Sequence, residues 1–207
     1  MRFRTATSTD IEAVAALHAD SWSRFYRGAY SDEYLDGAMP AERLTAWTAR
    51  LTAPEPRHVT IVAEPEPAGP AHPEVAPTGA PHTGAAEASG SRQELAGFVH
   101  LVVDEDPRWG SLVDNLHVTN TRRRGGLGSA LLARAARAAA ERGTTAALYL
   151  WVQEQNAAAQ AFYTAHGGQV VERARVSDPG GIPGRLNGNP LKLRVTWPDA
   201  ALVARRH

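Results

Sequence analysis

The chain has 207 residues, enough for one domain with a substantial core, and its 22 basic and 22 acidic residues argue against a polyanion such as duplex DNA as the main partner. The absence of cysteine excludes a disulfide framework, a thiolate metal site and a cysteine nucleophile. Neither a signal-like start nor a run of about 18 apolar residues is present, so we expect a soluble, cytoplasmic protein without a membrane partner.

Short strands and helices alternate along the chain, a pattern typical of an α/β domain. The predicted strands are residues 2–5, 58–64, 94–106, 111–118, 146–152, 169–176 and 191–197. The predicted helices begin near residue 9 and cover 31–37, 40–53, 126–142 and 156–168.

Two of the N-terminal helices carry apolar residues at helical spacing. Thr9 and Glu12 fit a capping box at the start of the first helix, and Ser31 fits an N-cap of the second. The apolar faces predicted for the first and third helices are Ile11, Val14 and Leu17, and Leu44, Trp47 and Leu51.

Residues 65–93 are rich in Pro, Gly and Ala and contain almost no large apolar side chain. Such a segment buries too little surface to offset its ordering entropy, which predicts a disordered insertion between two strands. A recognition segment is the alternative, but no PxxP array with flanking basic residues supports it. We therefore expect one domain over residues 1–197 and a tail at 198–207 that frays.

An antiparallel hairpin of residues 94–106 and 111–118 leads into a basic, glycine-rich junction. Gly125, Gly126 and Gly128 lie where the 126–142 helix begins, directly after Arg122–Arg124. Free backbone N–H groups, the positive helix end and the arginines predict a diphosphate site. The arginines of a solvated turn are the alternative reading.

Two common phosphate motifs do not fit this junction. A Walker loop needs a lysine at the helix start, and the only lysine of the chain is Lys192. A Rossmann fingerprint needs its third glycine where Leu131 stands.

The remaining pattern, Arg-Arg-Gly-Gly-Leu-Gly at 123–128, resembles the first motif of the GCN5-related N-acetyltransferases (GNAT family). The segment LWVQEQNAAAQAFYTAHGG at 150–168 is similar to the second family motif, and the resemblance covers nearly the whole chain except the insertion and the tail. It implies a single-domain GNAT-like fold, with a central mixed, mostly antiparallel sheet flanked by helices and with strands splayed at an acetyl-CoA site. The residues implied to bind acetyl-CoA are Leu116, His117, Val118, Arg123, Arg124, Gly125, Gly126, Leu127, Gly128, Ser129 and Asn156.

The resemblance also implies an enzyme that transfers an acetyl group directly to a primary amine. Tyr163 is the implied general acid for the thiolate, although composition alone would make it an ordinary half-buried aromatic residue. Asp114 is our candidate base because period-two alternation predicts that it shares a strand face with Leu116 and Val118, while Glu33 and Glu105 remain alternatives.

Other features of the sequence bear on the site. Asn156 also fits a simple helix cap, and the strand histidines His100 and His117 are interpreted as packed or surface residues rather than catalytic ones. No residues show metal-ligand spacing, so we expect no metal. Ribosomal-protein N-terminal acetyltransferases carry a glutamate where Trp151 stands here, and many family members have glycine in place of Arg124.

The expected acceptor is a small-molecule or peptide amine, with specificity set by residues 21–36 and by the loop 177–190. Asp32, Glu33 and Asp36 suit a cationic amine, although a solvated helix face explains them equally well. We expect a monomer or homodimer and no nucleic-acid partner. A non-catalytic acyl-CoA sensor of the same fold is the alternative function.

Overall fold

The computed structural model describes residues 1–66 and 94–205. The predicted insertion at 65–93 therefore lies, except for its first two residues, outside the described residues. The strands are β1 (Arg2–Thr5), β2 (His58–Glu64), β3 (Gly97–Asp106), β4 (Gly110–Val118), β5 (Leu148–Gln153), β6 (Gln169–Arg175) and β7 (Leu191–Trp197). The α-helices are α1 (Ile11–Phe25), α2 (Asp32–Asp36), α3 (Met39–Thr52), α4 (Leu127–Arg142), α5 (Ala157–Ala165) and α6 (Ala200–Ala204).

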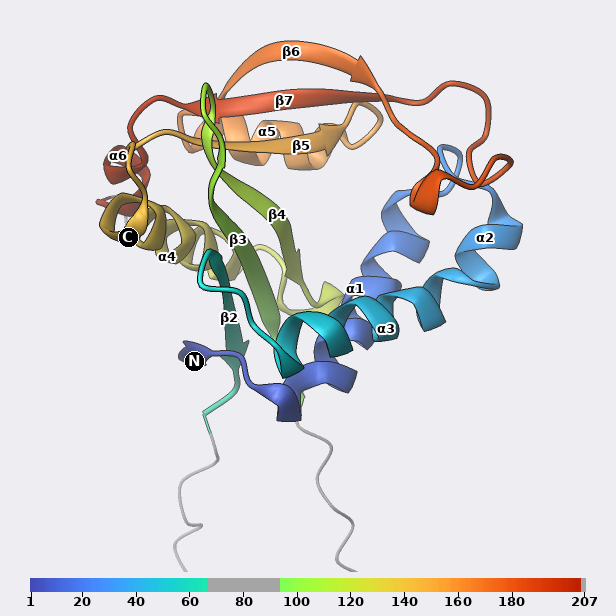
Figure 1. The fold of residues 1–207 in the computed structure, drawn as a ribbon, viewed down its shortest axis with the longest axis horizontal. Helices are drawn as coiled ribbons and strands as arrows, with labels where there is room; N and C mark the ends of the chain where they lie inside the picture. The colour runs from blue at the N-terminus through green and yellow to red at the C-terminus, as the bar shows by residue number, and fades with distance from the viewer. Residues whose placement is uncertain (67–93, 206–207) are drawn as a thin grey trace, which may run out of the picture.

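The described strands form one sheet in the order β1-β2-β3-β4-β5-β7-β6 (Figure 1). The pairing of β4 with β5 is parallel, and the other neighbouring strands pair antiparallel. The predicted α/β fold with a mixed, mostly antiparallel sheet flanked by helices is thereby confirmed. No helix among residues 1–66 and 94–205 is both long and apolar enough to cross a bilayer.

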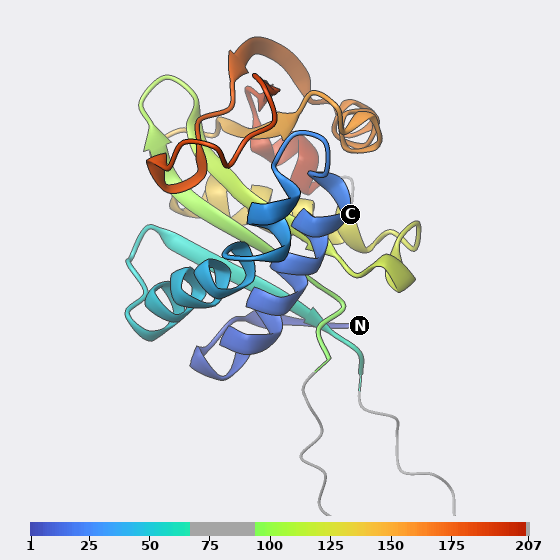
Figure 2. The same cartoon turned by 90° about the vertical axis from the view of Figure 1, so that its right-hand side faces the viewer.

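Helices cover both faces of the central strands. Figure 2 shows α1 and α3 side by side across one face, and α4 lies on the other (Figures 1 and 2). Along β3, Val99 and Leu101 pack into the core under α4, whereas Phe98 packs with Trp47 of α3. This alternation explains why nearly the whole strand is buried and apolar.

The sheet opens between β4 and β5. Pairing is confined to Ser111 with Leu148 and Leu112 with Tyr149, and beyond these residues the two strands separate. A β-bulge interrupts the pairing of β3 with β4 nearby. His100 pairs with Asn115 and Leu101 pairs with Val113, so Asp114 has no partner on β3. The splayed strands implied by the family resemblance are present.

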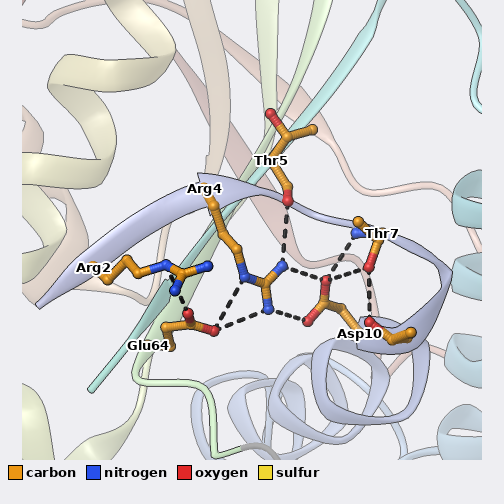
Figure 3. A network of polar contacts seen from close by, with 7 residues as sticks. Arg2, Arg4, Thr5, Thr7, Asp10 and Glu64 are labelled. Atoms are coloured by element: carbon orange, nitrogen blue, oxygen red, sulfur yellow. Dashed lines mark hydrogen bonds and ion pairs between the residues drawn. The ribbon is translucent and has the colours of Figure 1, made fainter. Parts of the chain in front are cut away.

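An ion-pair network joins β1, β2 and the start of α1 (Figure 3). The Arg4 guanidinium donates to both carboxylate oxygens of Asp10, at 2.7 and 2.8 Å, and to Oε2 of Glu64 at 2.9 Å. Asp10 also accepts from the Thr7 backbone N–H at 2.8 Å. The capping box therefore spans Thr7 and Asp10 rather than Thr9 and Glu12, because a short 3₁₀ turn at Ser8–Asp10 precedes α1.

Two further local predictions differ from the structure. Leu44 is 43% exposed although Trp47 and Leu51 of the same helix are buried, so the apolar face of α3 is narrower than predicted. The tail does not fray over residues 200–204: it forms α6, whose Ala200 and Val203 are fully buried against the core that contains α4.

Candidate active site

A cavity of about 1080 Å³ lies where β4 and β5 separate. Its walls come from α1, α3, the end of β4, β5, one face of α5, and the loop before α4 with the first turn of that helix. Segments far apart in the sequence therefore meet at the gap in the sheet.

One end of the cavity is built by the basic junction before α4. Its lining includes Arg122, Arg123, Arg124, Gly126, Gly128 and Ser129. Among the described residues no side chain caps the N-terminus of α4, and no acidic residue stands in its first turn. The free N–H groups of that turn, together with the arginines, make this end attractive to an anion.

The backbone of the junction explains its glycines. Arg124 and Gly126 have φ values of 65° and 76°, the left-handed region that favours glycine, which agrees with the glycine that many related sequences carry at position 124. A Cβ at Gly126 would meet no atom within 4 Å, so the space beside this backbone is open to a ligand. Gly125 and Leu127 do not line the cavity, and Leu127 instead packs into the core.

Two polar residues of the predicted set occupy defined positions beside this end. Asn156 caps α5 by accepting from the Ala159 N–H at 3.1 Å, and it also lines the cavity, so both readings of this residue apply. The Ser129 hydroxyl lies 2.8 Å from Nε2 of His166, a residue that the sequence did not single out.

The end of β4 forms the floor of the cavity. Leu116 and Val118 line it and also pack against the core under α4. His117 also lines the cavity, on the α1 side, where its ring lies 4.8 Å from that of His18. Burial lowers the pKa of His117 to about 4, so its imidazole is neutral near pH 7. His100 is fully buried and does not line the cavity.

Tyr163 lies on α5 at the wall of the cavity. Its ring packs 5.2 Å from Phe162 and 6.0 Å from Trp197. Burial raises the pKa of the Tyr163 hydroxyl above its usual value of 10, so the group stays protonated at neutral pH.

Asp114 lines the cavity but not on the predicted face. Its carboxylate pairs with Arg50 of α3 at 2.9 Å and accepts from the Asn115 amide at 2.6 Å. The β-bulge breaks the period-two alternation, and Asp114 therefore faces α3, while Leu116 faces the α4 side. The two alternative bases, Glu33 and Glu105, do not line the cavity.

The acceptor region is aromatic, with Trp22, Tyr26, Trp47 and Trp151 in its walls. The three carboxylates expected to attract a cationic amine, Asp32, Glu33 and Asp36, do not line these walls, and Asp32 and Asp36 are exposed and pair with Arg27. None of residues 177–190 lines the cavity either.

The loop 177–190 instead contacts α3 and the segment before α2, and so holds the helices of the cavity wall in place. Its Arg185 pairs with Glu42 of α3 at 2.5 Å, and its Asn187 donates to the Tyr30 carbonyl at 3.0 Å. The contribution of this loop to the cavity is thus the placement of α2 and α3.

Two cationic residues of the cavity wall were not predicted from the sequence. Arg43 and Arg50 lie on the inner face of α3, two helical turns apart, and both line the cavity. Their seven-residue spacing, which places them on the same face of α3, could have indicated this position from the sequence. Arginines on an amphipathic helix usually belong to its solvated face, however.

The sequence profile described as the acetyltransferase (GNAT) family matches residues 19–167, well over half of the chain. The chain belongs to the GNAT acetyltransferase family. In this GNAT chain the matched region contains the arginine-rich junction, the separated strands β4 and β5, and Tyr163. Among curated proteins, a sequence comparison gives no match.

Solved structures share the fold of this GNAT chain at low sequence identity. The PaiA N-acetyltransferase of Thermoplasma acidophilum, solved with coenzyme A, is 16% identical with a TM-score of 0.59, over 95% of this chain and 98% of that one. The protein yncA of Salmonella typhimurium, solved with acetyl-CoA, is 18% identical with a TM-score of 0.56, over 96% and 93%. Ribosomal-protein-alanine N-acetyltransferase of Brucella melitensis is 19% identical with a TM-score of 0.58, over 95% and 99%.

Proposed function

We propose that this chain is an acetyl-CoA-dependent N-acetyltransferase that moves the acetyl group directly to a primary amine in a ternary complex. The observation that carries the proposal is one cavity that joins the open N-terminus of α4, with its arginines, to the protonated hydroxyl of Tyr163. The complexes of related folds with coenzyme A and acetyl-CoA support this choice of donor.

The donor site follows from the geometry of the cavity. Arg122, Arg123, Arg124 and the N–H groups at the start of α4 would bind the diphosphate. On the β5 side, no strand of the described residues pairs with β4 from Leu116 to Val118, so the backbone groups along this edge can hydrogen-bond the pantetheine arm and the thioester oxygen.

Two residues are proposed for the proton transfers. Tyr163 donates a proton to the departing sulfur, for which its hydroxyl is buried and protonated. Asp114 accepts the proton of the incoming ammonium, directly or through water, from its position on the wall beside α3. Charge that develops on the thioester oxygen is stabilised by the backbone N–H groups of β4.

A first experiment measures acetyl-CoA binding by calorimetry and CoA thiol release over a panel of primary amines. We expect tight binding and amine-dependent release. Binding without release from any amine would favour the alternative of an acyl-CoA sensor, whereas no binding would overturn the donor site.

Replacing Gly128 by Val tests the donor site itself. A Cβ at Gly128 would lie 3.5 Å from the Phe162 ring and 3.9 Å from Val118, so a branched side chain would fill the space between the helix start and the cavity floor. We expect acetyl-CoA affinity to fall about tenfold or more, as for the loss of a charge-assisted contact. Ala140→Val, at an exposed position of the same helix, is the matched control.

A further inference from the structure

We propose that the acceptor amine also carries a carboxylate, and that Arg43 binds this group. The inference rests on the proposed function and narrows it to one substrate class: small amino acid-like amines with an apolar body. It is carried by a half-buried arginine whose Nε is buried without a hydrogen bond, by the charge of the cavity wall and by the aromatic residues around that arginine.

Arg43 has no ionic or hydrogen-bonding partner within the described part of the chain. Its Nε is buried without a hydrogen bond, and its guanidinium lies 4.7 Å from the centre of the Trp22 ring. The neighbouring Glu42 is already engaged by Arg185 and by the Tyr34 hydroxyl. A buried N–H group without a hydrogen-bond partner is costly, and an oxyanion from the cavity would supply that partner.

The charge of the cavity wall selects against a purely cationic acceptor. Among the described lining residues of α1, α3, β4 and β5, Arg43 and Arg50 carry positive charge and Asp114 is the one carboxylate. Asp114 is paired with Arg50, so the unbalanced charge belongs to Arg43. A polyamine would place further positive charge beside it without a carboxylate to bind.

Positive charge continues where the wall reaches Trp151. The Lys192 ammonium lies 4.4 Å and the Arg194 guanidinium 4.5 Å from the centre of the Trp151 ring. Arg194 is paired with Glu172 at 2.8 Å, so Lys192, just outside the cavity lining, is the group that adds attraction for an anionic acceptor as it approaches.

The residues around Arg43 indicate the size and character of the acceptor. A guanidinium binds a carboxylate through two parallel hydrogen bonds, which fixes its orientation as well as its position. Trp22 and Tyr26, whose rings lie 5.0 Å apart, offer apolar surface beside it. The acceptor therefore presents its amine toward the thioester while its carboxylate is fixed at Arg43.

The test compares acceptors that differ only in the carboxylate: phenylalanine with phenylalaninamide and phenethylamine, and 4-aminobutyrate with butylamine. CoA release gives kcat and KM, and calorimetry on the protein–CoA complex gives affinity. We expect at least one carboxylate to be favoured about tenfold to hundredfold in kcat/KM, the usual effect of a charged hydrogen-bond pair.

Arg43→Met should remove this preference, mainly through KM, and leave acetyl-CoA affinity unchanged. Arg43→Lys should restore part of it, and Arg137→Met, at an exposed position of α4, should leave it intact. If the carboxylate-free amines react equally well or better, or if Arg43→Met leaves the preference unaltered, the inference is wrong while the proposed function stands.

The outcome without turnover is also decisive. If acetyl-CoA binds but none of the carboxylates binds the CoA complex or reacts, the inference is overturned. If acetyl-CoA itself fails to bind, the proposed function fails first, so the two failures are distinguishable.

Discussion

Tyr163 is the residue on which the proposed chemistry depends most directly. Its hydroxyl makes no hydrogen bond with any described residue, so Tyr163→Phe removes the proton donor without leaving a buried partner unsatisfied. We expect kcat to fall about 10²–10⁴-fold with acetyl-CoA affinity unchanged, as for the loss of a general acid. Steady-state kinetics and calorimetry provide the two measurements.

Tyr149→Phe is the matched control, because Tyr149 is buried on β5 but does not line the cavity. Its variant should keep wild-type kinetics. Unaltered turnover in Tyr163→Phe would contradict the assigned role, and equal losses in both variants would indicate a structural effect.

At the same scale, the sequence predicts some residues that line the cavity and misses others for identifiable reasons. Tyr163 and the junction 122–129 follow from motifs in which type and spacing are fixed by the ligand. Asp114 was placed on the wrong face because a β-bulge without a distinctive sequence signal interrupts the strand. Arg43 was missed because an arginine on an amphipathic helix is identified as a cavity residue only when its neighbours in space are known.

Among the elements, β1, β2 and the start of α1 depend on the ion pairs of Figure 3. Asp10 is 0% exposed. Burial alone would raise the pKa of its carboxyl, but the hydrogen bonds from Arg4 and Thr7 outweigh it and lower the pKa. Asp10→Asn should therefore reduce the free energy of unfolding by about 2–3 kcal/mol, because it leaves Arg4 with a weaker partner.

Denaturant unfolding measures this loss. Asp20→Asn, which breaks the exposed pair with Arg24 on α1, is the control and should cost less than about 1 kcal/mol. Similar losses in both variants would show that the Asp10 network contributes no more than a surface ion pair.

The elements also show where local sequence patterns suffice. The order and type of the strands and helices follow from periodicity, since each amphipathic segment buries one face. The separation of β4 from β5 was predicted only through the family resemblance, because the pairing of strands that are distant in the sequence depends on the whole sheet and not on a local pattern. The helix α6 was read as a tail because five residues give too short a pattern to recognise.

For the molecule as a whole, acid should reduce stability through histidines that are buried uncharged. Burial lowers the pKa of His100 to about 3 and that of His117 to about 4, from an ordinary value of 6.5. Between pH 6.5 and about 4 the unfolded chain binds protons that the folded chain does not, so the free energy of unfolding decreases as the pH falls. Each such histidine contributes a slope of up to about 1.4 kcal/mol per pH unit.

His100→Gln tests this dependence away from the cavity. Glutamine keeps a polar group for the Thr60 hydroxyl, which lies 2.8 Å from Nδ1 of His100, and it does not titrate. Denaturant unfolding from pH 8 to 4 should show that the free energy of unfolding declines less steeply below pH 6.5 in the variant than in the wild type. The difference between the two proteins at pH 8 gives the cost of repacking around the glutamine. If the stability curves of the two proteins run parallel, His100 does not drive acid unfolding. The decline must then come from His117, from His18, or from carboxylates such as Asp10. The lowered pKa of Asp10 also makes the free energy of unfolding decrease as the pH falls, but at lower pH.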